Sequence, residues 1–162
     1  VLALISCHSE GQVAFTETKH LPFLKQSLET SGLLIYRKPD FFSKQIQKPQ
    51  FEQYDIDQET VVIKRHGEAP VSLQLSDSRA LSALTAAVRG PLLGDRALLE
   101  RFFTIHLGGQ KSHWLLVLSP KDDEISKTIE QIKIQGQNDH IQEILIREPD
   151  GSLSTLRLKY VP

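Results

Sequence analysis

Residues 31–42 read Ser-Gly-Leu-Leu-Ile-Tyr-Arg-Lys-Pro-Asp-Phe-Phe, and this stretch decides how the chain is expected to fold. An apolar run starts at Gly32, becomes cationic at Arg37 and Lys38, and ends at Pro39. Proline has no backbone N–H for a sheet ladder, so it ends a strand or lies on an edge. An apolar strand that brings cations to the rim of an apolar surface indicates a binding site more than a plain core.

The composition is typical of a globular domain without a strong net charge. The chain has 162 residues, of which 40% are apolar and 24% charged. We therefore expect one domain over residues 1–162 that buries its own core without disulfides or metal. The 19 basic and 20 acidic residues leave a net charge of −1. Nothing in this balance favours a nucleic acid or an anionic membrane surface as a partner.

The N-terminal residues indicate a processed precursor. Methionine is absent, even at position 1, so we expect the chain to begin inside a longer precursor whose signal peptide has been removed. Leu4-Ile5-Ser6-Cys7 is similar to a lipoprotein processing site. The alternative, which we favour, is a weak helix over residues 1–10 in which Cys7 is a small apolar residue. A single cysteine forms no internal disulfide.

Alternating apolar residues and turn signals predict a chain made mainly of strands. In the first strand, Phe15, Glu17 and Lys19 fall on one side. The expected strands cover residues 15–21, 29–38, 42–47, 51–56, 60–66, 71–75, 103–107, 113–118, 129–135, 141–147 and 153–160. The expected fold is mainly β with helices, in which about eleven strands form one large, curved antiparallel sheet with helices against one face.

The main expected helix covers residues 79–89 and has an apolar stripe. Leu81, Leu84 and Val88 are spaced i, i+3 and i+7, and Gly90-Pro91 is expected to end the helix. A second short helix is expected over residues 94–101. If helix and sheet meet loosely, the space between them is an apolar cavity, and if they meet tightly, the core is filled. The residues by themselves favour the filled core.

No pattern typical of catalysis or metal binding is present. His106 and His113 flank an expected turn at Gly108-Gly109 and could face each other across a hairpin, but no cysteine or close carboxylate joins them. Neither a Gly-x-Ser-x-Gly elbow, a phosphate-binding glycine loop nor a His-Glu-x-x-His motif occurs. We therefore expect no catalytic residue, no metal, no cofactor and no enzyme activity.

A series of weak motifs, in a fixed order along nearly the whole chain, resembles one family. The motifs are Phe15-Thr-Glu, Ser31-Gly32-x-Leu34, Lys38-Pro39-Asp40-x-Phe42, Pro49, Asp57-Gln58-Glu59-Thr60-Val61, Leu116-x-Leu118-x-Pro120-Lys121 and Asp150-Gly151-Ser152. In order and spacing the chain resembles the LolA-type periplasmic carriers of outer-membrane lipoproteins, and it is most similar to their divergent relatives.

The resemblance implies an incomplete β-barrel of about eleven strands with a helical lid over an apolar cavity. It implies a periplasmic monomer that binds the acyl chains of lipoproteins, or of another acylated lipid, without covalent catalysis. Its partners would be an inner-membrane donor complex and an outer-membrane acceptor. The runner-up function is a protein-binding sensor or scaffold module of the same fold with a filled core. A lipid-ester hydrolase that uses Ser and His on the rim is less favoured.

The resemblance also implies site residues. The family has an arginine directly before the motif proline, which latches the lid by hydrogen bonds to lid carbonyls. Here Lys38 takes that position and Arg37 precedes it, and a lysine lacks the planar fork of an arginine. Alternation sends the two cations to opposite faces. The acyl cavity is expected to be lined by Leu34, Tyr36 and Phe42 on the sheet, by Leu81, Leu84 and Val88 on the lid, and by Leu116 and Leu118 on the far wall.

Overall fold

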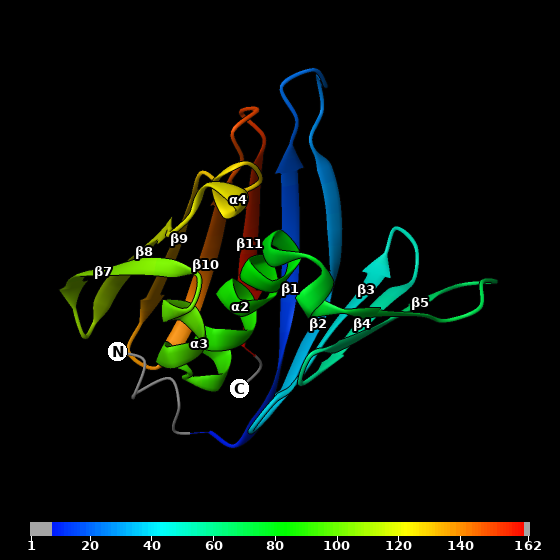
Figure 1. Cartoon of the computed structure of the whole chain (residues 1–162), viewed down its shortest axis with the longest axis horizontal. Coiled ribbons are helices and arrows are strands. Elements are labelled where there is room, and N and C mark those ends of the chain that lie inside the picture. The colour runs from blue at the N-terminus through cyan, green and yellow to red at the C-terminus, as the bar shows by residue number, and fades with distance from the viewer. Residues whose placement is uncertain (1–7, 161–162) are drawn as a thin grey trace.

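The structure is a computed structural model that describes residues 8–160. Within this range, eleven strands form one sheet in the spatial order β6-β5-β4-β3-β2-β1-β11-β10-β9-β8-β7. Every neighbouring pair is antiparallel, and the sheet is open because β6 and β7 lie at its two ends. The helices cover one face of the sheet (Figure 1), which we call the inner face. The expected antiparallel fold of about eleven strands is confirmed.

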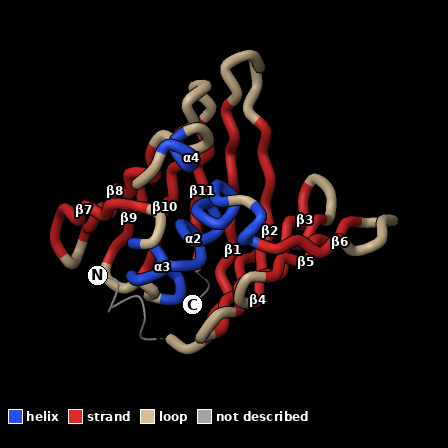
Figure 2. The backbone as a smooth tube through the Cα atoms, in the orientation of Figure 1, coloured by secondary structure: helices blue, strands red, loops and turns tan. Residues whose placement is uncertain are grey.

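The sheet consists of two meanders, each contiguous in sequence (Figure 2). The first contains β1 (Glu10–His20), β2 (Leu28–Arg37), β3 (Phe41–Lys48), β4 (Glu52–Asp57), β5 (Thr60–Arg65) and β6 (Val71–Gln74). The second contains β7 (Phe103–Gln110), β8 (His113–Pro120), β9 (Gln131–Gln137), β10 (His140–Arg147) and β11 (Leu153–Lys159). The two meanders join where β1 pairs with β11.

Helix α2 (Arg79–Leu93) links the two meanders across the inner face. It follows the 3-10 turn η1 (Leu75–Asp77), and the hydroxyl of Ser78 caps it by accepting a hydrogen bond from the N–H of Leu81. Two shorter helices are α3 (Arg96–Glu100), directly after α2, and α4 (Asp123–Ser126), between β8 and β9.

The helix end predicted at Gly90-Pro91 is wrong, because α2 continues to Leu93. A proline inside a helix removes one intrahelical hydrogen bond. Here Leu92 and Leu93 are only 2% and 6% exposed, and the burial of two leucines offsets that loss. Gly94 ends the helix in the left-handed conformation, with φ at 68°, and its N–H donates to the carbonyl of Pro91.

The turn predicted at Gly108-Gly109 is also wrong. Both glycines lie within β7, and the chain turns at Lys111 and Ser112. Gly109 has a φ of +86°, and a Cβ there would lie 2.3 Å from the carbonyl oxygen of His113. This glycine therefore permits a close approach of two strands.

The histidines that flank the glycine pair do not face each other. His106 pairs with Val117, and His113 pairs with Gln110. Over residues 8–160, no group of three or more His, Cys, Asp or Glu side chains is arranged to hold a metal ion. No helix in the same part of the chain is long and apolar enough to cross a membrane.

The N-terminal prediction falls mostly outside the described residues. Residues 1–7, and with them Cys7, are not described, and the last part of the expected helix is not helical because Glu10 already belongs to β1.

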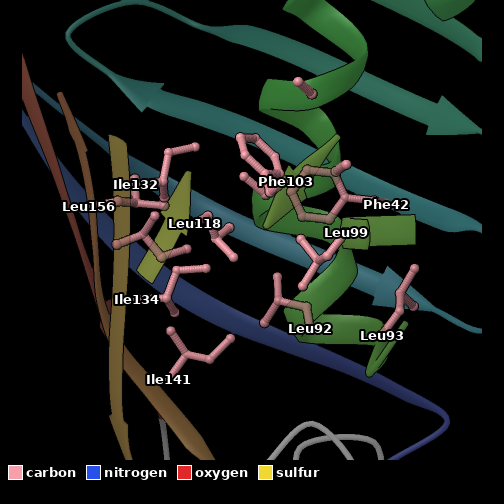
Figure 3. Packing of buried hydrophobic residues seen from close by; sticks show 14 of the residues in the cluster. Phe42, Leu92, Leu93, Leu99, Phe103, Leu118, Ile132, Ile134, Ile141 and Leu156 are labelled. Atoms are coloured by element: carbon pink, nitrogen blue, oxygen red, sulfur yellow. The ribbon is translucent and has the colours of Figure 1, made fainter. Parts of the chain in front are cut away.

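Many of the largest fully buried side chains belong to the second meander. Side chains that alternate inward from β8, β9 and β10 pack under the end of α2 and under α3 (Figure 3). This cluster, which we call the filled side, has fully or almost fully buried members in Leu99, Phe103, Leu116, Leu118, Ile132, Ile134, Ile141 and Ile144.

Candidate ligand cavity under helix α2

A cavity of about 430 Å³ lies between residues 81–88 of α2 and the inner face of the sheet. Its walls come from β1 to β5, from the C-terminal part of β10 and the residue that follows it, and from β11. Its apolar lining residues are Leu28, Phe42, Ile46, Tyr54, Ile56, Val61, Leu81, Leu84, Val88, Ile146 and Leu156. We call this part of the molecule the hollow side, since helix and sheet do not fill the space between them.

Strand and helix periodicity explain why these residues meet. On β3, Phe42, Lys44 and Ile46 all point to the inner face because alternate residues share a face. On α2, Leu81, Leu84 and Val88 form one stripe. These three helix residues are only partly buried, because the stripe faces the cavity instead of packed side chains.

Four of the eight predicted cavity residues line this cavity, namely Phe42, Leu81, Leu84 and Val88. The other four are buried in the packed cluster and do not belong to its lining: Leu34, Tyr36, Leu116 and Leu118. Leu116 and Leu118 lie on β8, in the filled side. On β2 the cavity is lined by Leu28 and Thr30, nearer the start of the strand than Leu34 and Tyr36.

The cavity has a closed end and an open end. Phe42, Ile56 and Val61 are 2–3% exposed and form the closed end. At the open end, Leu28 is 51% exposed and lies near four charged side chains that also line the cavity. An amphiphile would therefore enter with its apolar end first.

The four charged residues at the open end form two ion pairs. Lys44 Nζ lies 2.5 Å from Glu17 Oε2 and 5.2 Å from the ring centroid of Phe15. Lys19 Nζ lies 3.4 Å from Glu148 Oε1. Sequence reasoning did not place these residues in the site. The alternation along β1 could have placed them there. Glu17 and Lys19 lie on the same side of the strand as Phe15, and an aromatic residue indicates the side that faces the core.

Neither of the predicted gate cations lines the cavity. Arg37 is exposed, and its guanidinium carbon lies 4.8 Å from the ring centroid of Phe41. The backbone N–H of Lys38 donates to the carbonyl of Ser9 at 2.7 Å.

A different arginine joins the helix to the sheet. Arg89 of α2 is 4% exposed, and its Nη1 donates to the carbonyl of Gln58 in the β4–β5 turn at 2.9 Å. Burial lowers the pKa of the Arg89 guanidinium, and the carboxylates of Glu59 and Asp40 oppose that shift. At its other end α2 is held by an ion pair between Arg79 and Asp122, at 2.5 Å. The helix is thus fixed to both meanders while its middle spans the cavity.

Comparisons with known proteins agree with this architecture. The profile described as outer membrane lipoprotein carrier protein LolA-like matches residues 1–158. The crystal structure of a LolA superfamily protein from Nitrosomonas europaea is similar with a TM-score of 0.54 and 11% identity, and the match covers 99% of this chain and 91% of that chain. A DUF1329 family protein from Desulfovibrio piger gives a TM-score of 0.51 and 9% identity, with 98% and 87% covered.

At such low identities these two likenesses show the fold alone. A search of curated proteins finds no match. The family profile, in contrast, covers nearly the whole sequence. The chain therefore belongs to the LolA-like family of outer membrane lipoprotein carriers.

Proposed function

We propose that this protein is a periplasmic carrier that binds an acyl chain of a lipoprotein, or of a related lipid, in the cavity under α2. It acts as one domain and transfers its cargo toward the outer membrane without covalent catalysis. The observation that carries the proposal is an apolar cavity of about 430 Å³ between helix and sheet in a member of a lipoprotein carrier family.

The size of the cavity suits a single chain. A volume of about 430 Å³ lies within the range of roughly 300–1,000 Å³ that is usual for ligand pockets in proteins. A chain of 16 carbons offers on the order of 10 kcal/mol of gross burial energy, at about 0.8 kcal/mol per methylene. Ordering the chain and loosening α2 consume part of this. The remainder supports reversible binding, which a carrier needs.

In this proposal Phe42, Leu81, Leu84 and Val88 contact the acyl chain directly. Leu34, Tyr36, Leu116 and Leu118 lie in the packed core, and in this proposal they contact a longer chain only if α2 shifts.

Arg89 is the proposed anchor of the lid, because it makes the helix-to-sheet bond described above. Arg37 and Lys38 remain candidates for gating through contacts made when the lid opens. The proposed partners are an inner-membrane donor complex and an outer-membrane acceptor.

The proposal is tested by displacement of a fluorescent 16-carbon fatty acid from the purified protein. Leu84→Asp places a charge in the cavity and is expected to weaken binding by more than about tenfold, since it opposes the burial of several methylenes. The matched control is Leu107→Asp, because Leu107 is 58% exposed on the edge strand β7, outside the cavity lining. Circular dichroism verifies that both variants are folded.

The proposal is wrong if the folded wild-type protein does not bind the probe, or if both variants bind it equally well. Capture of a protein partner by a chain that binds no lipid would favour the sensor or scaffold alternative.

A further inference from the structure

The open end of the cavity carries two positive and two negative charges. They are Lys44 on β3, Glu17 and Lys19 on β1, and Glu148 directly after β10, and all four line the cavity. Their side chains are between 22% and 38% exposed. We call these four residues the charged belt.

Local geometry explains the contact between Lys44 and Glu17. The two residues lie on β3 and β1, so the lysine must cross the intervening strand β2. At this point β2 carries Gly32, which pairs with Phe15 on one side and with Ile46 on the other. A Cβ at Gly32 would lie 1.8 Å from the carbonyl oxygen of Gln45. A larger residue does not fit there without a shift of β3, so β2 places no side chain between Lys44 and Glu17 at this position.

The stability of the fold does not account for the charged belt. Ion pairs of this exposure add little to stability. Where such pairs border an apolar space, apolar residues of similar size would stabilise the fold equally well or better. The residues around them, such as Ile46, Leu156 and Ile146, are apolar. Two ion pairs at the entrance of an apolar cavity are therefore better explained by recognition of a ligand.

The belt retains hydrogen-bonding capacity for a ligand. An ammonium has three donors, and a carboxylate has about four lone-pair sites. The bond from Lys44 to Glu17 uses one donor of the lysine, and the bond from Lys19 to Glu148 does the same. The hydroxyl groups of Thr30 and Ser154 line the same cavity.

We propose that the belt selects the head group of the cargo, and that this head group is zwitterionic, with an ammonium and a phosphate, on a single acyl chain. This inference rests on the proposed carrier function and makes it more specific. The phosphate lies near Lys44 and Lys19, and the ammonium near Glu17 and Glu148. The belt has equal numbers of positive and negative charges, so a zwitterion keeps the entrance neutral. A head group with a single charge leaves an excess charge in a partly desolvated site. In this proposal one chain occupies the cavity of about 430 Å³.

The test compares three 16-carbon ligands by isothermal titration calorimetry, below the concentrations at which they form micelles. They are a lysophosphatidylethanolamine, hexadecyl phosphate and hexadecylammonium, which are zwitterionic, anionic and cationic. We expect the zwitterion to bind at least about fivefold more tightly than either of the others, the scale of one partly exposed ion pair.

Removing either the two negative or the two positive charges of the belt is then expected to change which of the three ligands binds most tightly. The double variant Glu17→Gln with Glu148→Gln is expected to bind hexadecyl phosphate most tightly. The double variant Lys44→Gln with Lys19→Gln is expected to favour hexadecylammonium. The matched control pairs Lys64→Gln with Asp55→Asn, which removes an ion pair at 3.0 Å that does not line the cavity. This control is expected to keep the wild-type order.

Failure of this inference is distinguishable from failure of the carrier function. If the three ligands bind equally well, or if the belt variants keep the wild-type order, the head-group inference is wrong and the carrier function stands. If the folded wild-type protein binds the fluorescent fatty acid but none of the three ligands, only the head-group inference is wrong. If it binds none of these four ligands, both are wrong.

Discussion

The hollow side and the filled side share one sheet and one helix, yet they are packed in different ways. In α2, every residue from Arg89 to Leu93 is buried, whereas Leu81, Leu84 and Val88 stand half-buried over the cavity. On the filled side the inward residues are mainly Ile, Leu and aromatic residues without charge. On the hollow side they include the four residues of the charged belt. The C-terminal part of α2 is thus fully packed, and the cavity lies under residues 81–88 of the helix.

The largest expected effect is on the free energy of unfolding, when one isoleucine on each side of the molecule is replaced by alanine. Ile134→Ala on the filled side is expected to lower the free energy of unfolding by about 3 kcal/mol, because it leaves a new cavity in a packed core. Ile46→Ala is expected to cost less than about half of this, since Ile46 already borders empty space. Urea denaturation measures both values. Equal losses would contradict the distinction between the two sides.

The second expected effect is that the hollow side tolerates larger residues. Leu84→Phe is expected to change the free energy of unfolding by less than about 1 kcal/mol, because the ring enters the cavity. The affinity for a 16-carbon fatty acid is expected to fall by about tenfold, the equivalent of roughly two buried methylenes.

The matched control for this prediction is Ile134→Phe, which overpacks the filled side and is expected to cost about 1–3 kcal/mol with no direct effect on the ligand. A Leu84→Phe variant that binds as tightly as the wild type would show that the chain lies elsewhere.

The smallest expected effect on global stability concerns the anchor between helix and sheet. Arg89→Met removes the bond to the Gln58 carbonyl, but it also removes a buried cation whose Nε has no hydrogen-bond partner among residues 8–160. The free energy of unfolding is therefore expected to change by less than about 1 kcal/mol. Hydrogen exchange of the α2 amides is expected to become several-fold faster.

The control for the anchor is Arg96→Met on α3, where the arginine is exposed and pairs with Glu100. It is expected to leave the exchange of α2 unchanged. If Arg89→Met also leaves it unchanged, Arg89 is not an anchor of the lid.

The sequence predicted the strands well because most of them alternate or end at clear turns. The region of β7 and β8 is one exception, since a Gly-Gly pair usually marks a turn, but Gly108 and Gly109 lie within a strand. The helix end was also missed, because the burial of Leu92 and Leu93 is a tertiary effect that outweighs the local signal of Pro91.

The candidate site was predictable only in part. Residues such as Phe42 and Leu84 follow from periodicity together with the resemblance to the family. Periodicity cannot distinguish a residue that lines a cavity from one that packs in a core, and for this reason Leu34 and Leu118 were placed in the cavity lining. The pairing of Lys44 with Glu17 was not predictable, because it crosses a strand and depends on the tertiary position of Gly32.

The strand order has a consequence for how the chain folds. Within each meander, every strand pairs with its neighbours in sequence, so both meanders can form from local hairpins. The exception is the contact between β1 and β11, which joins residues 14–20 to residues 153–159. Closing that long loop has the largest entropic cost of any strand pairing in the sheet. We therefore expect the docking of β1 on β11 to be the slow step of folding, and the cavity, whose walls come from both sides of this junction, to be complete only after it.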